Sequence, residues 1–432
     1  MTRFRSEVFW VVAGQALSAL GTLVGVRLLT QMLAPAQYGV LSLALGMSVL
    51  SGNLVTAPLT QAAIHFYPRY SAERLCELRD SLWRGLRRLL PWITLVALIG
   101  GAYYSLSRRG SPGLVVLVLL LFALECWRTS CLSLLNAARE QRRYGLWSAC
   151  DAWFRPLAAA AAVLLAGHGA MAALAGYVLT SATLSLLWSR NLWPARAPAA
   201  VPPSQARALD MAMWSYALPL IPLGLLTWVT TLGDRYIIGG ALSVSDAGLY
   251  AAVYGLAYSP FMILSSAAEQ AIRPVYQTAV SHGDQERARR LLWLWLAGVC
   301  LLCAAGVLLF AATHDLIARV LISPGYRHAS WLMPWVALGY GIRCVSYVFE
   351  RVCYAYGRTW RVLLIQVCAA STTLIVTPLA VLNFGLQGAA CAVPVCFGMQ
   401  CLAAALLARR TIREAAGAHR APTIRAAGPA VS

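Results

Sequence analysis

Long apolar runs, each separated from the next by a short polar segment, follow one another along almost the whole chain. A helix that crosses the hydrocarbon core of a bilayer needs about 20 mostly apolar residues. Because the runs have this length, the pattern predicts an all-α polytopic membrane protein. We place about twelve transmembrane helices at residues 8–30, 38–64, 89–106, 113–137, 146–166, 170–189, 211–233, 247–270, 291–312, 329–350, 361–382 and 386–408.

The basic residues between these runs predict the orientation of the helices. The chain contains no lysine, so all 35 basic residues are arginine. With the N-terminus placed inside, 26 arginines fall in inner segments, five in outer loops and four within spans. Because cytoplasmic loops carry the excess of basic residues, this split predicts that both termini are cytoplasmic.

Composition excludes several classes of protein. Apolar residues make up 59% of the chain and charged residues only 12%, whereas a soluble domain has about 25% charged residues. A net charge of +19 can indicate nucleic-acid binding, but here the arginines lie between apolar runs, as membrane topology requires. A P-loop needs lysine, and the HExxH, GxSxG and GxGxxG motifs are missing. We therefore predict a transporter and not an enzyme, with no cofactor and no nucleic-acid partner.

The two halves of the chain resemble each other. The segment from Arg27 to Gly39 aligns with the segment from Arg235 to Gly248 through a similar apolar turn. Each lies at the start of a six-helix half of the same orientation, which indicates two parallel six-helix bundles of the kind found in transporters. A Pro-rich stretch separates the halves. We predict an N-terminal bundle at 1–195, a cytoplasmic linker at 196–210, a C-terminal bundle at 211–409 and a cytoplasmic tail at 410–432.

Charged residues within the predicted spans are candidates for function, because each costs at least about 2.5–3.5 kcal/mol to insert. Arg128, Arg155 and Arg343 lie deep in three different helices. If they face a shared water-filled cavity, they form an anion site, since the guanidinium fork binds phosphate oxygens bidentately. The alternative is local pairing of Arg128 with Glu125 and of Arg155 with Asp151.

Acids and tyrosines supply two further groups of candidates. Glu125, Asp151 and Glu269 are candidates for coupling transport to an ion. Tyrosines at helical spacing on the eighth span, and one on the tenth, could stack on sugars; the alternative is bundle packing. These tyrosines are Tyr250, Tyr254, Tyr258 and Tyr347. We interpret the polar face of the first helix, with Gln15, Ser18 and Thr22, mainly as packing.

The sequence around two motifs resembles a known family. The stretch from Val26 to Leu43, with Arg27 and Tyr38-Gly39, resembles the opening of Wzx-type oligosaccharide flippases, members of the multidrug/oligosaccharidyl-lipid/polysaccharide exporter superfamily. The stretch Leu-Gly-Asp-Arg235-Tyr, followed by Asp-Ala-Gly-Leu-Tyr250, resembles the start of the second half in that family. The motifs add Arg27 and Arg235 to the candidate anion-binding residues.

This resemblance implies both a fold and an activity. The fold is a V-shaped, MATE-like pair of six-helix bundles around a central cavity that opens to either side in turn. The activity is transfer of an undecaprenyl-diphosphate-linked oligosaccharide from the cytoplasmic to the periplasmic leaflet of the bacterial cytoplasmic membrane, driven by an ion gradient. The product serves O-antigen, capsule or exopolysaccharide assembly, with a polysaccharide polymerase as a possible partner besides membrane lipids.

Two alternatives stand beside this interpretation. Multidrug exporters of the superfamily have a similar helix count, but they generally expel cations, for which an arginine-rich cavity is ill suited. A membrane enzyme of glycan assembly, such as a polymerase, usually needs a sizeable catalytic loop outside the bilayer, and the sequence has no such loop. Lipid II flippases usually carry fourteen helices, which argues against that substrate.

Overall fold

The computed structural model describes residues 2–67, 77–89, 91, 112–138, 140–167, 169–189 and 203–420, and these segments contain helices but no strand. The helices are α1 (Thr2–Met32), α2 (Pro35–Ser51), the π-helical turn η1 (Gly52–Thr56), α3 (Ala57–Phe66), α5 (Pro112–Ala137), α6 (Gln141–Ala166), α7 (Ala170–Ser189), α8 (Pro203–Ala217), α9 (Leu220–Ala241), α10 (Val244–Ser281), α11 (Gln285–Leu321), α12 (Pro324–Arg327), α13 (Leu332–Ala355) and α14 (Thr359–Arg420).

The helices follow the predicted spans closely. Within the described segments, nine helices are long and apolar enough to cross a membrane. One of them, α14, consists of two helices that meet at Gly385, whose φ of 57° and ψ of −138° interrupt the helix. A residue without a Cβ adopts a positive φ most easily, which explains why the helix breaks at a glycine. The break falls between the predicted spans at 361–382 and 386–408. The predicted span at 89–106 lies almost entirely outside the described residues.

The seventh predicted span is divided by prolines. Helix α8 ends at Ala217, and α9 begins at Leu220 immediately after Pro219. The apolar face of α8, with Leu209 and Met213, packs into the N-terminal half against α3 and the helical segment 77–89. Ser81 and Arg84 of that segment hold α8 through Asp210, at 2.5 Å and 2.8 Å from its Oδ1. The helices before and after Pro219 therefore pack mainly on different halves of the molecule.

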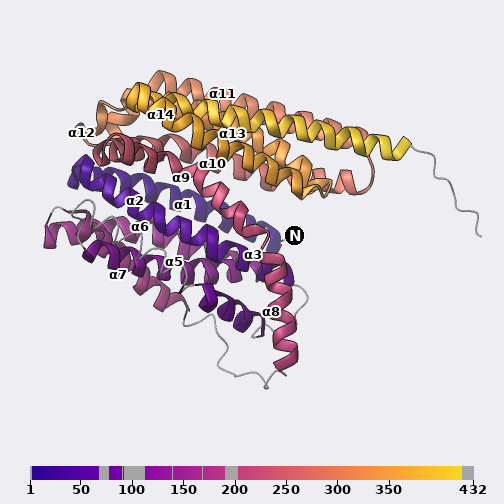
Figure 1. The fold of residues 1–432 in the computed structure, drawn as a ribbon, viewed down its shortest axis with the longest axis horizontal. Coiled ribbons are helices and arrows are strands. Elements are labelled where there is room, and N and C mark those ends of the chain that lie inside the picture. Colours follow the sequence, from indigo (N-terminus) through magenta and orange to yellow (C-terminus); the bar gives the residue numbers. More distant parts are fainter. Residues whose placement is uncertain are drawn as a thin grey trace, which may run out of the picture.

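The helices form two bundles that diverge toward one end of the molecule (Figure 1). The N-terminal bundle contains α1, α2, α3, α5, α6 and α7, and the C-terminal bundle contains α9, α10, α11, α13 and α14. The bundles lie together near α12 and separate toward the end where α8 and the C-terminal half of α14 lie. By the arginine distribution, this open end faces the cytoplasm. The all-α, two-bundle fold expected from the sequence is confirmed.

Large apolar side chains cover the outside of both bundles. Leu165 on α6, Leu301 on α11 and Leu382 on α14 are 89%, 73% and 70% exposed. Exposed apolar surface on this scale is incompatible with water but matches the hydrocarbon core of a bilayer. Together with the long apolar helices, it makes the chain a multi-pass membrane protein.

Candidate functional site

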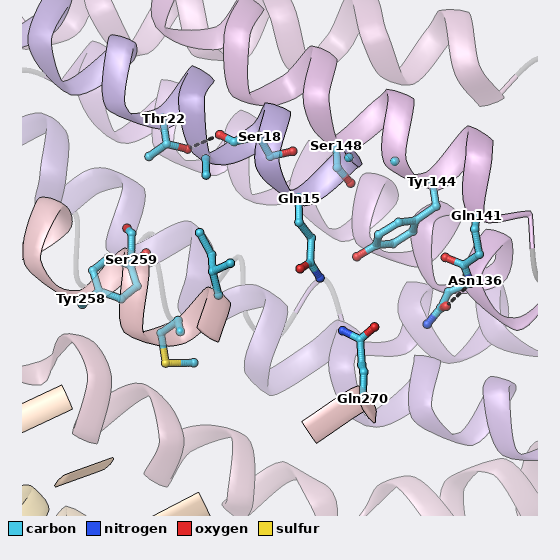
Figure 2. A pocket seen from close by; sticks show the side chains of 15 residues that line it. Gln15, Ser18, Thr22, Asn136, Gln141, Tyr144, Ser148, Tyr258, Ser259 and Gln270 are labelled. Carbon is cyan, nitrogen blue, oxygen red and sulfur yellow. Dashed lines mark hydrogen bonds between the residues drawn. The ribbon is translucent and has the colours of Figure 1, made fainter. Parts of the chain in front are cut away.

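The larger of two neighbouring cavities lies between the bundles and has a volume of about 660 Å³ (Figure 2). Its walls come from α1, α5 and α6 on one side and from α10 on the other. Among the residues that the structure describes, none of the side chains that line it carries a charge. These residues are Gly14, Gln15, Ser18, Ala19, Thr22, Asn136, Gln141, Tyr144, Gly145, Ser148, Tyr258, Ser259, Met262, Ile263 and Gln270. We call this space the large cavity.

Helical spacing and a close helix contact create the polar wall of the N-terminal bundle. Gln15, Ser18 and Thr22 follow one another at three and four residues, so they share one face of α1. A Cβ on Gly14 would lie 2.8 Å from the Cα of Gly145. Because two glycines meet there, α1 and α6 approach closely, and the polar side chains of the two helices face the same space.

Figure 2 shows how amides face each other across the large cavity. Gln15 extends from α1 toward Gln270 of α10, so the pair belongs to different bundles. On the α5–α6 side, Gln141 donates to the side-chain oxygen of Asn136 at 3.0 Å. The cavity therefore offers amide and hydroxyl groups, which are both donors and acceptors. Such groups suit a ligand rich in hydroxyls.

A second, smaller cavity of about 290 Å³ adjoins the first. Tyr258 and Met262 line both spaces, so the cavities share a wall. Two arginines, Arg235 of α9 and Arg343 of α13, line only the smaller one. Its other lining residues are Leu45, Gly46, Val49, Thr231, Leu232, Tyr254, Tyr340 and Tyr347. We call this space the arginine cavity.

Arg235 lines the arginine cavity and forms no salt bridge with a carboxylate among the described residues. Its guanidinium lies over the ring of Tyr254, 5.3 Å from the centroid, and its buried Nε has no hydrogen-bond partner among the described residues. The neighbouring Asp234 accepts the Tyr250 hydroxyl at 2.6 Å and the backbone N–H of Arg235 at 2.8 Å. The acid is thus hydrogen-bonded elsewhere, while the Arg235 side chain lines the cavity.

Arg343 is held rigidly by neutral groups. It is only 1% exposed, and it donates through Nε to the Tyr347 hydroxyl at 3.0 Å and through Nη1 to Gln400 at 3.1 Å. Gln400 in turn donates to Glu350 at 3.0 Å, so the amide separates the arginine from the acid. The guanidinium also lies 4.7 Å from the ring centroid of Phe397. Within the described part of the chain, no carboxylate forms a salt bridge with Arg235 or Arg343.

Arg128 and Arg155 are placed differently. Arg128 contacts Glu125 at 2.6 Å and Asp151 at 3.1 Å, and Arg155 contacts the same acids at 2.6 Å and 3.4 Å. The Arg155 contacts lack hydrogen-bond alignment, so they act mainly through charge. We call these four residues the charge quartet. Its two cations and two anions cancel, and no member lines either cavity.

Of Arg128, Arg155 and Arg343, which the sequence predicted to face one shared cationic cavity, only Arg343 lines either of these two cavities. In the N-terminal bundle both arginines form salt bridges with the two acids. These salt bridges connect α5 to α6 and are not confined to one helix. Glu269 is likewise bound, by Arg273 at 2.9 Å and Arg351 at 2.8 Å. The three candidate coupling acids all form salt bridges in this conformation.

The four candidate tyrosines divide between core and cavity. Tyr250 is fully buried, and Tyr254, 2% exposed, pairs its hydroxyl with that of Tyr340 at 2.9 Å. Tyr258 lines both cavities, and Tyr347 lines the arginine cavity beside Arg343. The even spacing on α10 placed the tyrosines on one face but did not reveal how deep each one sits. Packing explains the position of Tyr250. Of the four candidate tyrosines, only Tyr258 borders the large cavity.

Arg27 lies at a contact between the bundles and not in either cavity. It donates from α1 to the carbonyl of Ile322, at the end of α11. Close by, the Tyr326 hydroxyl of α12 donates to the carbonyl of Leu33 at 2.8 Å, and the rings of Tyr326 and Tyr38 meet edge to face at 5.9 Å. We call this region the outer contact, since the predicted topology puts it on the periplasmic side.

Two glycines bring the bundles together at the outer contact. A Cβ on Gly39 of α2 would lie 2.0 Å from the carbonyl oxygen of Val244, and a Cβ on Gly248 of α10 would lie 2.0 Å from that of Pro35. The two contacts are reciprocal between the halves, at the two glycines that the matching motifs align. Since any side chain would separate the backbones, these glycines close the bundles at this end.

Several cavity residues were not identified as functional from the sequence. The polar face of α1 was interpreted as packing, although it forms one wall of the large cavity. The remaining polar lining residues were not identified as a group, because they come from three separate helices, α5, α6 and α10. They are Asn136, Gln141, Tyr144, Ser148, Ser259 and Gln270. Polar residues at helical spacing in an apolar segment were the available signal.

Comparisons with known proteins agree with this architecture. A profile of the polysaccharide biosynthesis protein family matches residues 4–279. No curated protein shows a significant sequence match. The structure of the lipid II flippase MurJ in an inward closed conformation superposes with a TM-score of 0.71 and 10% identity, covering 94% of this chain and 90% of the other.

Multidrug transporters have the same fold. An inward-facing MATE family transporter of the MOP superfamily superposes with a TM-score of 0.65 and 13% identity, covering 93% of this chain and 96% of the other. An outward-facing MATE structure gives a lower TM-score of 0.58 at 13% identity, covering 95% of both chains. The chain belongs to the polysaccharide biosynthesis protein family, and it has the fold of the MOP superfamily transporters.

Proposed function

We propose that the protein is a flippase for undecaprenyl-diphosphate-linked oligosaccharides. It moves the repeat unit from the cytoplasmic to the periplasmic leaflet of the bacterial cytoplasmic membrane, where a polymerase would use it for O-antigen, capsule or exopolysaccharide. The observation that carries this proposal is the joined pair of cavities between the bundles, one uncharged and polar and the other lined by two arginines. The family membership supports a role in polysaccharide assembly.

Arg235 and Arg343 are the proposed diphosphate site. Their guanidinium groups face the arginine cavity, while Asp234 and Glu350 are hydrogen-bonded to other groups. An arginine without a competing carboxylate can give its donors to a phosphate. Hydrogen bonds to charged groups contribute about 1.5–3 kcal/mol each, enough to hold a headgroup that must later be released. The polyprenyl chain would stay in the lipid.

The conformation supports alternating access as the mechanism. The outer contact joins the bundles at one end, and the large cavity lies toward the other end, where the bundles diverge. This is an inward-facing arrangement, ready to accept a substrate from the cytoplasmic leaflet. Transport then requires the outer contact to open while the inner ends close.

An ion gradient is the proposed source of energy. The chain lacks the lysine that a P-loop needs. Glu125 and Asp151 are carboxylates within the bilayer, and each contacts two arginines. A cation or proton that binds there must compete with an arginine, so ion binding and a shift of α5 against α6 would be linked.

A drug or metabolite exporter is the second candidate, favoured by the similarity to MATE transporters across 93% of the chain. A cationic drug needs a carboxylate or an open aromatic face in its site. No carboxylate lines either cavity in the described part of the chain. We therefore rank the export of cations below the transfer of a diphosphate lipid.

The test is the sidedness of lipid-linked oligosaccharide in spheroplasts of a strain that lacks the gene. We expect complete repeat units to accumulate on the inner face, and the intact gene to restore outward transfer. Arg235→Gln and Arg343→Gln should lower transfer about tenfold or more, since each removes charged hydrogen bonds. The control is Arg289→Ala, at an exposed residue far from both cavities. Normal transfer by both variants, at normal protein levels, would refute the diphosphate site.

A further inference from the structure

Gln15 and Gln270 present unused amides to the large cavity. In the described structure neither side chain forms a hydrogen bond with another residue, and Figure 2 shows the two amides directed toward each other. A primary amide has two donor hydrogens and one acceptor oxygen. Adjacent sugar hydroxyls can satisfy the donor and the acceptor together. The two amides are therefore suited to bind one sugar from opposite sides.

The electrostatics of the large cavity favour uncharged sugars over sugars that carry a carboxylate. None of the described side chains that line it is charged, and the charge quartet in the adjoining bundle is neutral as a group. Arg235 and Arg343, which form no salt bridge with a described carboxylate, line the other cavity. A carboxylate in the large cavity would lose water without gaining a cation, which is unfavourable. An uncharged sugar would exchange water for amide and hydroxyl contacts at little cost.

We propose that the large cavity is a site for uncharged sugars, held from both bundles by Gln15 and Gln270, and that it discriminates against sugars that carry a carboxylate. This inference rests on the proposed flippase function and defines its substrate class. Charge recognition is confined to the arginine cavity, which takes the diphosphate. The large cavity recognises the sugar, and the arginine cavity recognises the diphosphate.

The position of the amides also links recognition to transport. Gln15 belongs to α1 and Gln270 to α10, so a sugar between them connects the two bundles on the cytoplasmic side of the outer contact. A ligand shifts a conformational equilibrium only through interactions that differ between the two states. Both amides can contact the same sugar fully only when the inner ends of the bundles approach each other. A sugar that fits would therefore stabilise the conformation in which the inner side is closed.

The experiment uses the full-length protein in proteoliposomes with two radiolabelled polyprenyl-diphosphate trisaccharides. The lipids are identical except that one sugar is a hexose in the first and the corresponding hexuronate in the second. A membrane-impermeant oxidant, periodate, measures how fast the glycan reaches the opposite face. We expect the hexose lipid to move about tenfold faster, and loss of both amides in Gln15→Ala/Gln270→Ala to slow it about tenfold.

Two further variants separate recognition from folding. Gln270→Arg places a cation in the large cavity and should raise the hexuronate-to-hexose rate ratio about tenfold. Gln277→Ala, on the same helix but outside both cavities, should leave both rates unchanged. Equal rates for the two lipids, or an unchanged ratio in Gln270→Arg, would overturn the inference and leave the flippase function standing. Transfer of neither lipid would overturn the flippase function itself and this inference with it.

Discussion

At the scale of single residues, the same side chain has opposite roles in the two bundles. In the N-terminal bundle, Arg128 and Arg155 neutralise Glu125 and Asp151 and contribute to packing between α5 and α6. In the C-terminal bundle, Arg235 and Arg343 form no salt bridge with a carboxylate of the described residues, and both line a cavity. The number of arginines in the membrane therefore says little about the anion site. The partners of each arginine decide its role.

The charge quartet predicts a stability effect. Arg128→Ala leaves Glu125 and Asp151, 10% and 8% exposed, with one cation between them. Breaking a buried ion pair costs about 3–5 kcal/mol, so we expect a lower apparent melting temperature in detergent. The double variant Arg128→Met/Glu125→Gln, which removes one charge of each sign, should recover most of the loss. A similar decrease in Arg289→Ala, whose side chain is 70% exposed, would contradict this assignment.

At the scale of helices, two glycines determine how closely α2 and α10 meet. Gly39 and Gly248 each face a carbonyl of the other half at a distance that leaves no room for a Cβ. The break at Pro219 separates α8 from α9. Because of this break, α8 packs on the N-terminal bundle while α9 packs mainly on the C-terminal bundle. Breaks and close approaches of this kind set which helices move together.

A side chain at Gly248 should open the outer contact. The Cβ of Gly248→Val would collide with the Pro35 carbonyl, so the outward-open state should become more populated. A single cysteine at Ser18, in an otherwise cysteine-free protein, should then react with an impermeant maleimide from the periplasmic side. The matched control is Gly255→Val on the same helix, where a Cβ meets nothing within 4 Å. Labelling that is equal in the two variants would exclude the steric role of Gly248.

At the scale of the whole molecule, the arginine bias and the shape together assign the open end to the cytoplasm. The outer contact and the α11–α13 connection lie at one end, and α8 and the last residues of α14 lie at the other (Figure 1). A cavity that faces the cytoplasm is where a substrate assembled inside the cell can enter. The orientation therefore bears directly on the direction of transfer.

Protease access tests this orientation. Tags at Met1 and at Ser432 should resist an external protease in intact spheroplasts and be cleaved only after permeabilisation, because inner segments carry 26 arginines. A tag inserted after Gly167, between α6 and α7, should be cleaved without permeabilisation. Cleavage of either terminal tag in intact spheroplasts would reverse the topology and the proposed direction of transfer.

The sequence alone determined the all-α class and the positions of most described spans, and it predicted the family. Hydrophobic length is a local property that the bilayer selects directly, so the spans could be placed without knowing any contact. Only the tertiary structure decided which polar residues share a space. The pairing of Arg128 with Asp151 and the approach of Gln15 to Gln270 depend on how separate helices pack against each other. Helical periodicity predicts which residues lie on one face of a helix. Which other helix that face contacts depends on the packing of the whole molecule.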